Sequence, residues 1–104
     1  MDIQSIRQRA DLSFDTAVAK RNALERARSR QLVAHNDHLF MADATMINLV
    51  HVLKQRLAVF FVLDINNNPC EIKDAEVFLQ LLVQRNQESL NQYHQLCEQL
   101  KRRG

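Results

Sequence analysis

Glycine and proline are nearly missing from this chain, which contains one residue of each among 104. Their usual shares are ~7% and ~5%, and these two residue types supply most tight turns. Their scarcity argues against a fold of many short strands and favours a few long helices. The single glycine, Gly104, also leaves no glycine-rich loop that could cradle a phosphate or form an oxyanion pocket. We therefore expect no enzymatic activity and no catalytic residues.

Cysteines and long apolar runs are scarce as well. Cys70 and Cys97 stand in different predicted elements, so we expect reduced thiols among apolar neighbours, with a disulfide as the open alternative. Residues 1–9 lack the apolar core of a signal peptide, and the longest strongly apolar run, Leu57–Leu63, is too short to span a bilayer. These absences predict an intracellular protein without membrane contact.

Charge is nearly balanced, with a formal net charge of +2 and 25% charged residues. This composition and length are typical of one soluble globular domain, so we expect residues 1–104 to fold as a single unit. A net charge this small does not indicate a nucleic-acid partner unless basic residues cluster.

The first part of the chain predicts one long helix from about Asp2 to Ala34, because helix-forming residues continue without a glycine or proline. One arc of a helical wheel collects the apolar residues Ile3, Ile6, Ala10, Phe14, Ala17 and Leu24. At ~1.5 Å per residue the helix would be about 48 Å long, whereas a compact domain of this size has a radius of gyration of ~13 Å. Such a helix has to overhang its own core or find a partner.

The middle of the chain predicts a turn, a strand, a helix and a hairpin. Polar residues 35–37 favour a turn before a short strand at 39–42. Asp43 is placed to cap a helix that ends near Arg56 and is apolar on more than one face, so we expect it to be buried. Leu57–Leu63 reads as a strand, residues 64–68 as a turn, and Pro69 as the residue that stops the pairing before a return strand at 70–72.

The last part predicts a second long helix, from about Ala75 to Arg103, capped by Asp74. Residues at alternating three- and four-residue steps form an apolar seam: Leu79, Val83, Asn86, Leu90, Tyr93, Cys97 and Leu100. The positions beside the seam carry no firm charge, which is typical of a bundle or core helix rather than of a two-stranded coiled coil. We expect residues 77–83 to cover a sheet and residues 90–100 to bind a partner. Asn86 lies in the polar gap between these two segments.

These elements together predict a helix-rich α+β fold. It comprises a small antiparallel sheet of two or three strands, two long terminal helices and one short buried helix. The single domain divides into a long N-terminal helix at 1–35, a strand–helix–hairpin core at 36–74 and a long C-terminal helix at 75–104. The candidate partner-binding residues are Leu90, Tyr93, Cys97 and Leu100 of the last helix, with Phe14 and Leu24 of the first. Whether they meet within one chain or between chains stays open.

Two patterns suggest a metal, and both are incomplete. Asp64, Asn66 and Asn68 stand at alternating positions, as calcium ligands do, but Pro69 replaces the required glycine and Ala75 the required glutamate. His35 and His38 have a spacing that zinc sites use, but no third or fourth ligand follows. We expect a plain hairpin turn and solvated loop histidines, and no metal or cofactor.

A basic segment lies within the predicted first helix. It contains Lys20, Arg21, Arg26, Arg28 and Arg30, with Glu25 as the only acidic residue among them. These side chains predict a contact for an acidic partner or a phosphate backbone, which the planar fork of arginine suits. The alternative is that their long stems cover the domain while the charged ends stay in water. The second interpretation is favoured, because no aromatic residues alternate with the charges.

Two stretches in the second half resemble a known group of proteins. Val62–Ile72 (VLDINNNPCEI) and Gln87–His94 (QESLNQYH) resemble small uncharacterised proteins of large tailed phages that infect cyanobacteria. These motifs are turn and cap chemistry rather than a site, so the resemblance implies no activity. It implies a virus-encoded accessory or assembly factor in the cytoplasm of the host.

The sequence therefore predicts a non-enzymatic protein–protein interaction or assembly module. It would self-associate, or dock on a protein partner, through its amphipathic terminal helices. The alternative is a nucleic-acid-associated regulator that uses the segment Lys20–Arg30. An inhibitor or adaptor of a host enzyme is a third hypothesis, which the sequence does not separate from the first.

Overall fold

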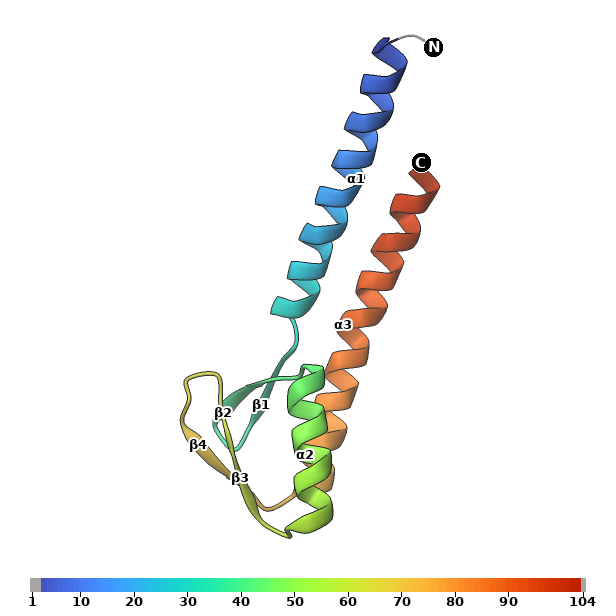
Figure 1. Ribbon diagram of the computed structural model, residues 1–104. Helices are drawn as coiled ribbons and strands as arrows, with labels where there is room; N and C mark the ends of the chain where they lie inside the picture. The colour runs from blue at the N-terminus through green and yellow to red at the C-terminus, as the bar shows by residue number, and fades with distance from the viewer. Residues whose placement is uncertain (1–2, 104) are drawn as a thin grey trace.

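A computed structural model describes the backbone of residues 3–103 and the side chains of residues 14–102. Three helices and two antiparallel hairpins follow one another along the chain, which confirms the helix-rich α+β class (Figure 1). The elements are α1 (Ile3–Ser29), β1 (Leu32–His35), β2 (His38–Met41), α2 (Ala44–Arg56), β3 (Phe60–Leu63), β4 (Pro69–Ile72) and α3 (Ala75–Arg103). The four strands form two separate two-stranded sheets, β1–β2 and β3–β4.

Helices α1 and α3 run antiparallel and side by side, and α1 continues past the carboxyl end of α3 (Figure 1). The molecule is therefore elongated, with extents of 66 × 23 × 22 Å and a radius of gyration of 19.3 Å. A compact domain of this length would have a radius of only ~13 Å. The expected overhang of the first helix is thus present, although Ile3, Ile6 and Ala10 of the predicted apolar arc lie outside the described side chains.

The predicted end of the first helix, at Ala34, is wrong: α1 ends at Ser29 and residues 32–35 are strand β1. Val33 pairs with Phe40 of β2, and both side chains are buried. This tertiary burial outweighs the helix preference of a stretch without glycine or proline. The turn itself agrees with prediction, because Asn36 and Asp37 adopt φ of 51° and 63°, the left-handed conformation that a two-residue hairpin turn requires.

Helix α2 begins and ends as predicted. The Asp43 side chain accepts a hydrogen bond from the Met46 backbone N–H at 2.8 Å, and the last helical residue is Arg56. The expectation that this helix is buried is wrong, since Val50 is its one buried residue while Leu49 and Val52 are exposed. Only one side of α2 faces the core, because α3 and the strands cover it from one direction.

The second hairpin is shorter than predicted on one strand and longer on the other. β3 begins at Phe60 rather than Leu57, and Pro69 belongs to β4, where it pairs with Leu63. The prediction that Pro69 stops the pairing is wrong, because a proline is tolerated at the first position of an edge strand, where its missing N–H leaves no partner unsatisfied.

One hydrophobic core lies between the two hairpins, α2 and the first half of α3. Its largest fully buried side chains are Phe40, Phe78, Ile72, Leu82 and Val50. The rings of Phe40 and Phe78 meet edge to face with centroids 4.8 Å apart. The His35 ring stacks on Phe78. The Ile65 backbone N–H donates to Leu39 O at 2.9 Å and so ties the two hairpins together.

The start of α3 covers this core with fewer residues than predicted. Phe78 and Leu82 are buried, whereas Val77, Leu81 and Val83 are exposed. Their alternation follows the helical period, because only one side of α3 can face the core. Within residues 3–103, no helix combines the length and apolar character needed to cross a bilayer.

Candidate functional site: the exposed face of the helical hairpin

Small residues hold the two long helices together. Ala23 and Ala27 of α1 are buried and lie against Tyr93 and Leu96 of α3. Alanine has no side chain beyond Cβ, so the two backbones approach closely along this line. The predicted contact face of the first helix, which contained Phe14, Ala17 and Leu24, is therefore not the side that meets α3.

A buried polar pair fixes the register where the helices meet the first hairpin. The Gln31 Nε2 group donates to Ser89 Oγ at 2.8 Å, and Ser89 Oγ donates to Asn86 O at 2.8 Å. Gln31 and Ser89 are both buried, so each bond replaces water that the polar atoms have lost. This polar gap was predicted as a simple interruption of the seam, but it is a specific link between the segment after α1 and α3.

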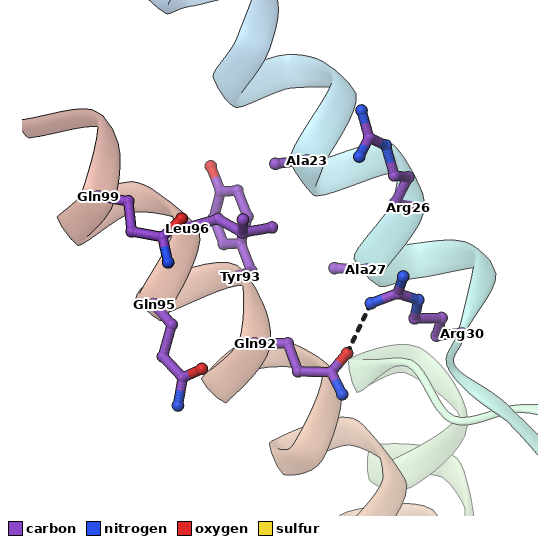
Figure 2. A pocket seen from close by; sticks show the side chains of 9 residues that line it. All are labelled: Ala23, Arg26, Ala27, Arg30, Gln92, Tyr93, Gln95, Leu96 and Gln99. Atoms are coloured by element: carbon purple, nitrogen blue, oxygen red, sulfur yellow. Dashed lines mark hydrogen bonds between the residues drawn. The ribbon is translucent and has the colours of Figure 1, made fainter. Parts of the chain in front are cut away.

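One side of the helical hairpin is a shallow groove lined by both polar and apolar side chains (Figure 2). Arg26 and Arg30 of α1 line it together with Gln92, Gln95 and Gln99 of α3, and Arg30 Nη1 donates to Gln92 Oε1 at 2.9 Å. The groove encloses about 260 Å³. Small-molecule sites usually exceed ~300 Å³ and are mainly apolar, so this groove does not suit a small ligand.

The opposite side of the hairpin brings together residues that the sequence had placed in separate sets. Arg28 is two residues from Arg26, and Cys97 is two residues from Gln95. Two residues along a helix correspond to a rotation of about 200° around its axis. Since Arg26 and Gln95 line the groove, Arg28 and Cys97 lie on the other side. A hydrogen bond with the Cys97 thiol and partial burial raise the pKa of the Tyr93 phenol, whereas the nearby charge of Arg28 lowers it.

We call this side the hairpin face and define it by two rows of residues. The α1 row is Arg21 and Arg28 with Leu24 beside it, and the α3 row is Val83, Leu90 and Cys97 with Tyr93 beside it. Within each row the spacing is seven residues, close to two helical turns, so the members lie on one side. Val83 is 41% exposed and Leu90 40%, whereas Phe14, at 68%, points away from α3 because it stands nine residues from the inward-facing Ala23. The face is therefore apolar and solvent-accessible, with two arginines on its α1 edge.

The predicted partner-binding residues do not all lie on this face. Leu100 is half-buried against Ala19 and Ala23, and Tyr93 also lies against the alanines, so these two meet the chain's own first helix. Phe14 and Leu90 are exposed, while Leu24 and Cys97 are half-buried. Tyr93 and Leu100 therefore pair within the chain, and contact between chains stays a prediction.

The five basic residues do not form one stripe. Lys20, Arg21, Arg26, Arg28 and Arg30 are all exposed, but Arg26 and Arg30 line the groove whereas Arg21 and Arg28 belong to the hairpin face. Among the described side chains, none of the five forms an ion pair with a carboxylate. Their positive charge is therefore available on two sides of α1 rather than concentrated on one.

A second polar cluster joins the two β-hairpins. His38 Nδ1 lies 2.7 Å from Asp64 Oδ2, and Asp64 Oδ1 accepts from the backbone N–H groups of Asn66 at 2.8 Å and Asn68 at 2.9 Å. An ionised carboxylate only accepts, so His38 Nδ1 carries the proton. The Asp64 oxygens thus shape the turn that the calcium-like spacing had suggested. In the part of the chain that the structure describes, no three His, Cys, Asp or Glu side chains come together as metal ligands would.

Acid is expected to weaken the fold through this cluster. The His38 ring N–H bond and the backbone N–H bonds of Asn68 and Asn66 hold the pKa of Asp64 below its ordinary value of 3.8. A carboxyl whose pKa is lower in the folded state contributes stability that is fully present above the unfolded pKa and is lost as the pH falls through the folded pKa. Asp64→Asn should therefore be less stable than wild type at neutral pH, and urea unfolding at about pH 7 and about pH 3 should show this gap narrowing.

Asp15→Asn is the matched control, because Asp15 is exposed. Its difference from wild type should be small at both pH values. If the stability difference between Asp64→Asn and wild type stays constant with pH, the contribution of Asp64 to stability does not depend on its ionised state, and the prediction is wrong.

The two thiols are unpaired, in agreement with the expected reduced state. Burial is the main reason that the pKa of Cys70 is raised, and the carboxylates of Asp64 and Glu71 add to the effect. The Cys70 thiol therefore stays protonated at neutral pH and is a poor nucleophile. It acts as an apolar core residue.

A further apolar surface, on the outer side of the β3–β4 hairpin, was not predicted. Phe61 is 65% exposed, and Leu63, Ile65 and Leu39 are exposed near it, with Ile65 and Leu39 joined by their backbone hydrogen bond. The sequence contained the signal: Leu57–Leu63 is apolar at every position instead of alternating, and a strand of that kind presents apolar side chains on both sides of its sheet.

Comparison of the chain with models of protein families, with curated proteins and with solved structures gives no match. Functional inference therefore rests on the residues themselves.

Proposed function

We propose that this chain is a non-enzymatic protein–protein interaction or assembly module that docks through the hairpin face. One observation carries the proposal: Val83 and Leu90 are exposed, and Leu24 and Cys97 half-buried, on one side of a helix pair whose inner side is closely packed. Burying a Leu, Val or Phe side chain is worth ~1.5–3 kcal/mol, so leaving several uncovered on one face is costly unless a partner covers them. In line with the phage resemblance, we place the module among virus-encoded accessory proteins of the host cytoplasm.

The alternative, a nucleic-acid-associated regulator, has less support. A phosphate backbone is best followed by basic residues on one side of an element. Here Arg26 and Arg28 differ by about 200° around α1, so one backbone could contact only part of the set. Because the five basic residues lie on two sides of α1, they do not form the single basic side that binding to a phosphate backbone favours.

Crosslinking from two matched positions tests the proposed function. Leu90 and Leu81 are both leucines of α3 with similar exposure, 40% and 37%, and nine residues is about two and a half turns, so they lie on opposite sides. We expect benzoylphenylalanine at position 90, irradiated in cells that naturally make the protein, to give one discrete product of higher mass. The same probe at position 81 should give little of it.

Equal crosslinking from both positions, or none from position 90, would remove the hairpin face as the docking surface. Circular dichroism on both variants checks that the helices are intact, so that a missing crosslinked product is not explained by unfolding.

A further inference from the structure

The hairpin face continues a surface on which a helix is already seated. Helix α2 packs against the side of α3 that carries Leu79 and Asn86, and Asn86 Nδ2 donates to Ala42 O at 3.0 Å just before α2 begins. Leu90 stands eleven positions after Leu79, and Cys97 stands eleven positions after Asn86. Eleven residues are about three helical turns, so Leu90 and Cys97 extend the same side of α3. Figure 1 shows α2 beside the lower part of α3 only. Within residues 3–103, no third helix covers the upper part of this side.

The charges around the uncovered part are mainly positive. Arg21 and Arg28 border it on α1 without a carboxylate in ion-pair contact, and Glu25, between them in sequence, forms no ion pair either among the described side chains. Glu98 and Glu88 of α3 are already paired with Lys101 and Arg85. Acidic residues along the edge of a partner helix would complement Arg21 and Arg28, whereas basic residues there would bring like charges together, which opposes binding.

We propose that this part of the hairpin face binds an amphipathic helix of another protein, with acidic residues along the edge of its apolar side, as a continuation of α2. The inference rests on the proposed interaction function and adds the chemistry of the partner. Leu90, Cys97 and Leu24 contact the apolar side of the incoming helix, and Arg21 and Arg28 pair with its carboxylates. Arginine suits this role because its fork binds a carboxylate through two parallel hydrogen bonds.

Two synthetic helical peptides test the inference. Both carry leucines at alternating three- and four-residue steps. One carries glutamates along the edges of that stripe and the other carries lysines at the same positions. Fluorescence polarisation at physiological salt should show the glutamate peptide binding about tenfold more tightly, which corresponds to ~1.4 kcal/mol. Arg21→Gln with Arg28→Gln should remove most of that preference.

The chain offers a matched control on the same helix. Arg26→Gln with Arg30→Gln removes two arginines from the groove side, so it lowers the net charge equally but should leave the preference for the glutamate peptide within about twofold of wild type. A loss of preference in this control variant would show a general effect of net charge and would overturn the inference. All four positions are exposed, so the variants retain the core.

Other occupants have distinct outcomes, and each would overturn the inference. Light scattering that shows dimers at rising concentration, abolished by Leu90→Asp, would assign the face to a second copy. Duplex DNA bound more tightly than ~10⁻⁴ M at physiological salt through Arg21 and Arg28 would assign it to nucleic acid. Equal affinity for both peptides would remove only the acidic preference, and the interaction function would stand unless the position-90 crosslink also failed.

Discussion

Phe78→Ala is expected to lower the free energy of unfolding by about 3–5 kcal/mol, the usual range for removing a buried aromatic ring. The Phe78 side chain is fully buried and contacts the rings of Phe40 and His35, each at a centroid distance of 4.8 Å. It is the residue through which α3 reaches both the core and the β1–β2 hairpin. Because small domains have total stabilities of ~5–15 kcal/mol, urea unfolding should show a large loss.

Phe61→Ala is the control for this prediction. Phe61 is the same residue type, but its ring lies on the outer side of β3 and is exposed. Its removal should change the free energy of unfolding by less than about 1 kcal/mol, since little buried area is lost. Similar losses in the two variants would mean that the core is not centred on Phe78.

The second large effect is expected from Ala27→Leu, which places a bulky side chain where α1 and α3 approach most closely. Ala27 is buried against Tyr93 and Leu96. Extra volume in a closed contact costs about 1–3 kcal/mol, because neighbouring side chains must leave their preferred rotamers or the helices must separate. Thermal unfolding should therefore begin at a lower temperature than in wild type.

Ala17→Leu is the matched control. Ala17 is exposed on the same helix, and alanine and leucine have similar helix propensities, so the substitution should be close to neutral. If Ala27→Leu were as stable as Ala17→Leu, the helices would not be held at the distance that the buried alanines imply.

Local chemistry made much of the fold predictable. Asp43 as a cap, the turn at Asn36 and Asp37, and the end of α2 at Arg56 each depend on a residue and its immediate neighbours, and each is confirmed. The end of α1 was not predictable in this way. No local signal stops a helix at Ser29, and strand β1 exists because Val33 pairs with Phe40 from a later segment.

The candidate site was predictable only as a list of residues. An apolar arc indicates that a helix has an apolar side but not which neighbour covers it. The side of α1 that meets α3 is marked by Ala23 and Ala27, which are too small to stand out in a hydrophobic pattern. Once these alanines face inward, Arg28 is turned to the same side as Cys97 and Leu90.

The most direct test of the hairpin face is an amide ¹H–¹⁵N spectrum of the full chain titrated with the glutamate peptide. If a third helix is seated above α2, the largest shifts will fall on residues of both rows, around Arg21 and Arg28 in α1 and Leu90 and Cys97 in α3. Shifts centred on the outer side of β3 at Phe61, or on the groove between Arg26 and Gln95, would contradict it.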